Sequence, residues 1–103
     1  MILEAAVLSI APAQKAPFEA AFAQARQVLA ESPGYLAVQL QRCIEADGRY
    51  LLLIQWRTLD DHLIGFRGSP RFSQWRALIG PFFTAPPELY HYEQVGGEGA
   101  ALQ

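Results

Sequence analysis

Charged residues are scarce in this chain of 103 residues, of which 17% are Asp, Glu, Lys or Arg, and the net charge is −2. The signs are mixed and no basic run occurs, which argues against nucleic acid as a partner. A single cysteine, Cys43, excludes an intrachain disulfide and a cysteine-rich metal site, and this usage is typical of a reducing compartment. Cys43 itself is expected to be a small buried hydrophobe.

Long apolar runs are missing as well. No stretch is long enough to span a bilayer, so no membrane partner is predicted. The tripeptide Ala11-Pro12-Ala13 resembles a signal-peptidase site, but Glu4 interrupts the apolar stretch before it and no basic residue precedes that stretch. The segment is therefore predicted to be a strand rather than a secretion signal, and the protein is predicted to be cytoplasmic.

Motifs for cofactors and metals are also lacking. The sequence contains no glycine-rich phosphate loop, no dinucleotide fingerprint, and no His-x-x-x-His or Cys-x-x-Cys pair. If the protein oxidises a substrate, the sequence therefore predicts that it does so without a cofactor. Such a reaction requires an electron-rich substrate that can be deprotonated, and an apolar pocket with a few polar groups to hold and ionise it.

Apolar residues, in contrast, are abundant at 51% of the chain. The length suits one domain with one core, predicted over residues 1–95, followed by a flexible Gly- and Ala-rich tail over 96–103. A small domain has too little interior to hide so many apolar residues. Some apolar surface is therefore expected to be covered by a partner, most simply a second copy of the chain.

The residue pattern predicts four strands and two helices. In chain order they are a strand over Ile2–Ile10, a helix over Gln14–Glu31, strands over Tyr35–Glu45 and Arg49–Arg57, a helix over Leu59–Phe66 that breaks and restarts at Ser69-Pro70, and a strand over Leu89–Val95. Asp47-Gly48, between the middle strands, predicts a tight hairpin turn. This order predicts an α+β, ferredoxin-like βαββαβ fold with a four-stranded antiparallel sheet backed by helices.

The second of the two middle strands is apolar on both faces. Leu52, Ile54 and Trp56 lie on one face, and Leu51 and Leu53 on the other. A strand in a lone two-layer domain should have one wet face, and no segment of this chain is left to cover the second one. The strand therefore predicts a homodimer.

The sequence also predicts which residues of one strand face the core and which residues cap the broken helix. The first middle strand is predicted to place four apolar side chains on one face: Leu36, Val38, Leu40 and Ile44. Thr58 and Ser69 are predicted to cap the two pieces of the broken helix.

Several short motifs in the second half of the chain occur together. They are Trp56-Arg57-Thr58, His62, Gly65-Phe66-Arg67, Ser69-Pro70-Arg71-Phe72, Trp75-Arg76-Ala77-Leu78, Gly80-Pro81-Phe82-Phe83 and His91-Tyr92. With them the chain resembles the antibiotic-biosynthesis-monooxygenase superfamily over roughly residues 3–95. The resemblance implies a dimeric α+β barrel, in which the sheets of two subunits form a central barrel and each subunit has a pocket between sheet and helices. Members of the superfamily include enzymes that oxidise polycyclic phenols with O₂ and no cofactor, and haem-degrading monooxygenases.

The haem-degrading members use an Asn on the first strand, a Trp on the short second helix and a His as axial ligand. Aligned on Ser69 and Phe72, the Trp position falls at Phe66 and the His position at Arg76, and the first strand contains no Asn. A guanidinium group has no free lone pair for iron. Haem degradation by that scheme is therefore not expected.

The candidate catalytic residues are His62 and Arg76. A neutral His62 could accept a phenolic proton near pH 7, and Arg76 could neutralise a phenolate or orient a carbonyl. The alternatives are a partly exposed helix histidine and an arginine paired with a surface carboxylate.

The candidate substrate-binding residues are Trp56, Phe66, Phe72, Trp75 and His91. The four aromatic side chains would line a pocket for a flat aromatic ligand, or alternatively fill a core. His91 would contact the ligand, or alternatively belong to a hydrogen-bond network in the wall of the sheet.

These features favour a homodimeric, monooxygenase-like oxidoreductase that acts without a cofactor on a small phenolic or quinoid molecule. One alternative is a non-catalytic dimeric module that binds a small hydrophobic ligand. Another is haem binding without the usual Asn, Trp and His.

Overall fold

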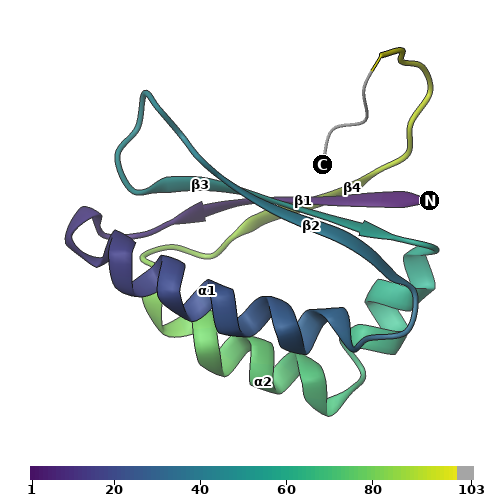
Figure 1. The fold of residues 1–103 in the computed structure, drawn as a ribbon, viewed down its shortest axis with the longest axis horizontal. Coiled ribbons are helices and arrows are strands. Elements are labelled where there is room, and N and C mark those ends of the chain that lie inside the picture. Colours follow the sequence, from purple (N-terminus) through teal and green to yellow (C-terminus); the bar gives the residue numbers. More distant parts are fainter. Residues whose placement is uncertain (100–103) are drawn as a thin grey trace.

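The computed structural model describes residues 1–99, which form a four-stranded antiparallel sheet with the helices on one face (Figure 1). The elements are β1 (Ile2–Ser9), η1 (Pro12–Gln14), α1 (Lys15–Ala30), β2 (Tyr35–Arg42), β3 (Arg49–Trp56), η2 (Asp61–Phe66), α2 (Pro70–Ile79), η3 (Gly80–Phe82) and β4 (Glu88–Tyr92). The strand order is β2-β3-β1-β4. The predicted ferredoxin-like βαββαβ fold with a broken second helix is confirmed. Of the predicted tail, residues 100–103 lie outside the described residues.

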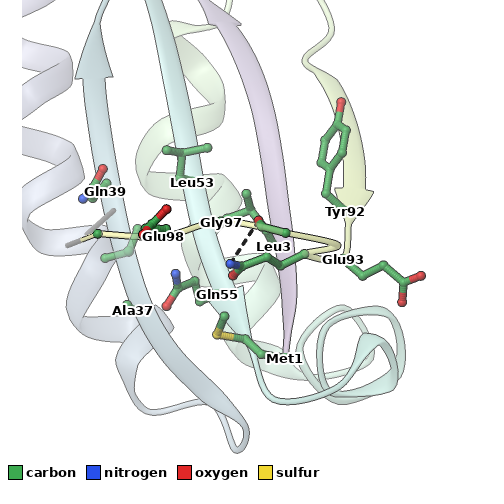
Figure 2. Close-up of a pocket in the computed structure, with 14 residues that line it drawn as sticks. Met1, Leu3, Ala37, Gln39, Leu53, Gln55, Tyr92, Glu93, Gly97 and Glu98 are labelled. Carbon is green, nitrogen blue, oxygen red and sulfur yellow. Dashed lines mark hydrogen bonds between the residues drawn. The ribbon is translucent and has the colours of Figure 1, made fainter. Parts of the chain in front are cut away.

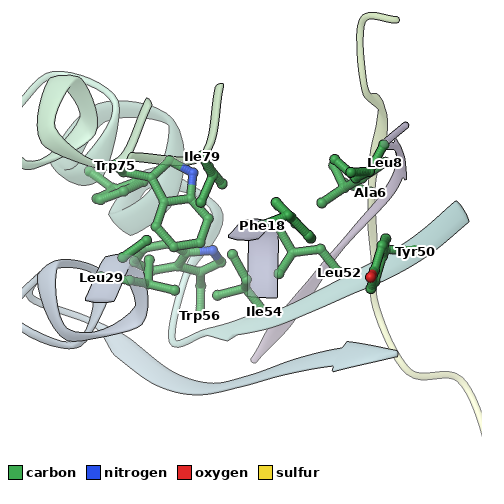
Figure 3. Close-up of a cluster of buried hydrophobic side chains, with 13 residues drawn as sticks. Ala6, Leu8, Phe18, Leu29, Tyr50, Leu52, Ile54, Trp56, Trp75 and Ile79 are labelled. Carbon is green, nitrogen blue, oxygen red and sulfur yellow. The ribbon is translucent and has the colours of Figure 1, made fainter. Parts of the chain in front are cut away.

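The core lies between the sheet and the two helices (Figure 3). Helix α1 contributes Phe18, Ala25 and Leu29, at the helical spacing that puts them on one face. Strand β3 contributes every second residue from Tyr50 to Trp56, as the pleat requires. Because these side chains come from elements far apart in the sequence, the core joins the helices to the middle of the sheet.

The connection between β2 and β3 is longer than the sequence predicted. Asp47 and Gly48 do lie in a turn, in which the Arg49 amide donates to the Ala46 carbonyl at 3.2 Å. The strands, however, close only at the hydrogen bond from the Cys43 amide to the Arg49 carbonyl, so the predicted tight hairpin is wrong. Cys43 lies half-buried in this loop rather than in the core.

Gly48 is required where this loop approaches the end of β1. Its φ is +82°, and a Cβ there would come within 2.0 Å of the Ile10 carbonyl oxygen. The Ile10 amide donates to the Gly48 carbonyl at 2.7 Å. The glycine thus has a positive φ and also permits a close backbone contact that the sequence did not indicate.

Strand β2 departs from the simple alternation. A register shift between Tyr35 and Ala37 places Leu36 outside the core, while Val38 and Leu40 pack against it. Ile44 lies beyond the strand end and is 93% exposed. The prediction of one continuous apolar face from Leu36 to Ile44 is therefore wrong at both ends.

The broken helix contains one π-helical segment, η2, in which the Arg67 amide donates to the His62 carbonyl at 3.0 Å. Thr58 caps it as predicted, since its hydroxyl accepts from the Asp61 amide at 3.1 Å. Ser69 precedes α2, but its hydroxyl donates to the Phe66 carbonyl at 2.7 Å instead of accepting from the new helix. Ser69 therefore connects the two helical pieces.

Candidate functional site

Three ionisable side chains form a row beneath the sheet. Glu4 Oε1 lies 3.2 Å from His62 Nε2, and His62 Nδ1 lies 2.7 Å from His91 Nε2. Trp56 Nε1 donates a hydrogen bond to the same Glu4 oxygen at 2.9 Å. Glu4 and His62 are 4% and 2% exposed, whereas His91 is half-buried. The row therefore runs from the interior toward the surface.

Each member of the row is positioned by a different element. Glu4 on β1 faces the helices with Ala6 and Leu8, because alternate residues of a strand share a face. His91 on β4 is the direct partner of Glu4 in the β1·β4 register. His62 enters from η2, so the row is assembled from segments at both ends of the chain and from its middle.

Burial shifts the pKa values of these groups in opposite directions. Burial raises the pKa of Glu4 to about 7, against smaller lowering effects of the Trp56 hydrogen bond and the Arg67 charge. Burial, together with smaller effects of His91 and the Arg67 charge, lowers the pKa of His62 to about 4. The pKa of His91 is also lowered, by burial and then by Arg67. At neutral pH both imidazoles are therefore uncharged and Glu4 can exchange a proton.

Aromatic rings enclose His62. Its imidazole stacks on the Trp56 ring at a centroid distance of 5.2 Å and on the Phe66 ring at 6.2 Å. Such an apolar enclosure penalises the cationic form of the imidazole. His62 is therefore a buried imidazole that is uncharged at neutral pH, not a partly exposed helix histidine.

The other predicted site residues separate into two groups. Trp56, Phe66 and Trp75 lie in the hydrophobic core, and Phe72 packs against it. Arg76 lies exposed on α2, with its guanidinium carbon 5.8 Å from the centroid of the Phe72 ring. The structure thus brings His62 and His91 together with Trp56 and Phe66, while the Arg76 side chain is exposed on α2.

Glu4 is the member of the row that sequence reasoning missed. The sequence did contain a signal, because Glu4 lies in phase with Ala6, Leu8 and Ile10 along the first strand. A carboxylate at a core-facing position is rare unless it has partners. The partners come from η2 and β4, and their proximity depends on the folded chain.

A separate hollow lies on the opposite face of the sheet. It has a volume of about 570 Å³ and is lined by Leu3, Leu53, Gln55 and Tyr92, among others. In Figure 2 the segment that follows β4 crosses over the sheet at Gly97 and Glu98, near Leu53 and Gln55. The strands contribute both apolar side chains and the amides of Gln39 and Gln55 to the lining, so the hollow suits a ligand or a partner surface rather than proton transfer.

The arrangement of the row does not suit a metal ion. His62 directs one ring nitrogen to Glu4 and the other to His91, so the three side chains do not converge on one point. Among residues 1–99, no group of three or more His, Cys, Asp or Glu side chains is arranged to hold a metal. No helix within the same residues has both the length and the apolar character needed to cross a bilayer.

Comparison with known proteins places the chain in a family. The model of the family "Antibiotic biosynthesis monooxygenase" matches residues 1–78. The chain belongs to this family. The fold is accordingly the subunit fold of the dimeric α+β barrel superfamily, as the resemblance implied.

Three relatives of this family member show how far the similarity extends. "Uncharacterized protein YczJ" of Bacillus subtilis is 41% identical over 95 residues, which cover 92% of this chain and all of that protein. The crystal structure of a "putative antibiotic biosynthesis monooxygenase" from Bordetella bronchiseptica is 41% identical, with a TM-score of 0.87 over 91% of this chain and 96% of that one. SnoaB of Streptomyces nogalater, a cofactor-independent oxygenase, is 20% identical, with a TM-score of 0.79 over 93% of this chain and 94% of that one. At that identity SnoaB supports the fold alone.

Proposed function

We propose that this family member is a homodimeric monooxygenase that oxidises a small phenolic or quinoid molecule with O₂ and without a cofactor. The observation that carries the proposal is the row formed by Glu4, His62 and His91. Its half-buried end can receive a phenolic proton, and its inner end can hold that proton near neutral pH. Membership of the antibiotic biosynthesis monooxygenase family supports the same reaction class.

The reaction needs only a base and O₂. Removing the phenolic proton gives an electron-rich phenolate, whose ring carbon para to the oxygen forms a C–O bond with O₂. The resulting peroxide takes a proton from the row, the same ring carbon loses its hydrogen as a proton, and the O–O bond breaks to release water. The balance is one phenol and one O₂ to one quinone and one water, so no external reductant is required.

The proposed dimer uses the sheet face that the helices leave uncovered. Leu51, Tyr90 and Tyr92 on this face are 38%, 66% and 52% exposed. In Figure 1 both helices lie on the other side of the sheet. A second copy packed on this face would cover the strand β3 that the sequence makes apolar on both sides.

A panel of phenols, naphthols and hydroquinones under air tests the proposed oxidation, with O₂ uptake and quinone absorbance as readouts. Wild type should turn over at least one class of compound without added metal, flavin or nicotinamide. His62→Ala should lower kcat on the order of 100-fold, the usual contribution of one positioned base. Ile64→Ala, an exposed position on the same η2 segment, is the matched control and should retain the rate. No turnover across the panel would contradict the enzyme proposal for these substrates.

A second candidate is a dimeric module that binds a small hydrophobic molecule without turnover. The hollow of about 570 Å³ on the uncovered sheet face favours it. In this case aromatic compounds would change the fluorescence of the protein in wild type and His62→Ala alike. Substituting Leu53 by Glu in the hollow would abolish that change.

A further inference from the structure

We propose that Glu4, His62 and His91 form a proton relay, in which the buried Glu4 carboxylate exchanges its proton with the surface through two neutral imidazoles. The three groups touch in sequence, at 3.2 Å from Glu4 Oε1 to His62 Nε2 and 2.7 Å from His62 Nδ1 to His91 Nε2. These are distances over which protons move once each N–H points at its acceptor. Glu4 itself is 4% exposed and so has little direct contact with solvent, whereas His91 is half-buried.

The proton transfer balances without either histidine becoming positively charged. Before transfer, Glu4 is ionised, and both rings carry their hydrogen on Nε2. A proton then arrives at His91 Nδ1, the His91 Nε2 hydrogen passes to His62 Nδ1, and the His62 Nε2 hydrogen passes to Glu4. Afterwards Glu4 is neutral and both rings carry their hydrogen on Nδ1. Each imidazole has accepted one proton and released one, so the only charge that has changed is on the carboxyl group.

The surroundings favour this neutral-ring scheme. Trp56 and Phe66 flank His62, so a lasting positive charge there is costly, while the Trp56 N–H stabilises the Glu4 oxygen that receives the proton. The apolar enclosure therefore favours proton transfer through neutral tautomers over a state in which a histidine holds the extra proton.

Other charged groups around the relay are few within the described residues. Arg67, in the turn after η2, is the cation that acts on all three members and lowers the pKa of each. Asp61 precedes His62 on η2, and its carboxylate faces Arg57 at 3.5 Å rather than the relay. On β3, Trp56 is the polar neighbour of Glu4 and carries no charge.

Tyr90 and Tyr92 flank His91 on β4 but project from the opposite face of the sheet, because neighbouring residues of a strand alternate. Since these tyrosines do not face the relay, the protonation of Glu4 is expected to control the tautomers of both histidines.

The use of the relay in catalysis rests on the proposed oxidation, in which Glu4 would take the phenolic proton and return one to the peroxide. The existence of the relay does not depend on that reaction. A test on the protein without substrate therefore separates the relay from the proposed oxidation. If the relay is found but no substrate is turned over, only the oxidation is contradicted.

The test is nitrogen-15 NMR of the imidazole rings in the full chain between pH 5.5 and 8.5. The relay predicts that His62 and His91 change together from the Nδ1–H to the Nε2–H tautomer as the pH rises, with one shared midpoint near the pKa of Glu4, about 7. Fixed tautomers across this range would overturn the relay. So would His62 and His91 gaining positive charge at two separate midpoints.

Two variants sharpen the test. Glu4→Gln keeps the shape of the side chain but cannot titrate, so the shared midpoint should vanish while both rings stay uncharged at neutral pH. Glu19→Gln removes a different carboxylate, one that binds Arg42 and Tyr50 at the molecular surface, and should leave the midpoint unchanged. A midpoint that persists in Glu4→Gln would show that the tautomers respond to another group. If Glu4→Gln does not fold, the wild-type titration alone still decides.

Discussion

The two faces of the sheet differ in a way that inverts the usual distribution of polarity. On the helix side, Glu4 and His62 are buried among aromatic rings. On the other side, Leu51, Tyr90 and Tyr92 are exposed. Buried ionisable groups and exposed apolar groups are the informative departures in a soluble domain, because each costs free energy unless something compensates for it.

The inverted distribution suggests that the two faces have different roles. On the helix side, Glu4 has the Trp56 N–H, and His62 has His91, so the buried polar groups satisfy one another. On the other side, no element of residues 1–99 covers the exposed apolar side chains apart from the segment after β4. We therefore propose that the helix side serves proton chemistry and that the uncovered face with Leu51, Tyr90 and Tyr92, here called the outer face, serves assembly.

The largest expected effect is on the stability of the helix side. Trp56→Ala removes a fully buried ring and leaves Glu4 without its N–H donor. Such truncations cost about 3–5 kcal/mol of unfolding free energy. Urea denaturation at pH 7 measures the loss, with the exposed Ile64→Ala as control, expected within about 0.5 kcal/mol of wild type. A loss in Trp56→Ala no larger than that of the control would contradict the assignment of this face as the core.

The next largest effect is on the pH dependence of stability, to which the buried Glu4 and His62 contribute. The folded-state pKa of Glu4, about 7, exceeds the ordinary value of 4.5, so the folded state binds more protons than the unfolded state between these values, and stability falls as the pH rises through them. The pKa of His62, about 4 against 6.5, acts in the opposite sense, because stability rises with pH through that window. In wild type the two slopes largely offset each other.

Glu4→Gln removes only the falling contribution. Its unfolding free energy relative to wild type should therefore increase from pH 4.5 to 7.5, by about 3 kcal/mol for a pKa shift of this size. Urea denaturation of both proteins across this range gives the difference. Glu19→Gln is the control of opposite sign: Arg42, then Tyr50, lowers the pKa of Glu19 by hydrogen bonding, so this variant should lose stability relative to wild type as the pH rises. A pH-independent difference for Glu4→Gln would mean that Glu4 is not a buried titrating group.

The outer face gives a third prediction, on assembly. Leu53 lies on this face in β3, and Leu53→Asp would place a charge in the proposed interface. We expect the dimer dissociation constant to rise by about 100-fold, the usual range for a central interface residue. Sedimentation equilibrium measures it. Ile44→Asp, in the exposed loop after β2, should leave the constant unchanged. A wild-type protein that is monomeric at all concentrations would contradict the assignment of the outer face.

The smallest expected effect lies away from both faces. Arg42 binds Glu19 through two hydrogen bonds, at 2.7 and 3.1 Å, at the exposed edge of β2. Arg42→Ala should cause only a small loss of stability, because exposed ion pairs are screened by water. Thermal unfolding checks this, and a larger loss would place part of the stability at the edge rather than in the core.

The fold was predictable from the sequence because periodicity determines it. The alternation of buried residues in β3 and the helical spacing of Phe18, Ala25 and Leu29 are visible in the sequence and are confirmed. The details that failed depend on contacts between distant segments. The length of the loop before Gly48, for example, is coupled to the backbone of Ile10, and the register shift after Tyr35 has no sequence signature.

The candidate site was predictable only in part. His62 and His91 were identified as site residues, but their mutual hydrogen bond required the pairing of β4 with β1, which brings His91 beside Glu4. The phase of Glu4 along the first strand was readable in advance. Its chemical role was not, because burial raises its pKa only once η2 closes over it.

The proton affinity of Glu4 decides whether the helix side performs proton chemistry. Carbon-13 NMR of the glutamate carboxyl groups, with Glu4 assigned by the signal lost in Glu4→Gln, gives that value directly in the full chain. The relay predicts a midpoint near 7, shared with both histidines. A midpoint at the ordinary value of 4.5 would show an ionised carboxylate that does not exchange protons near neutral pH, and would contradict the relay.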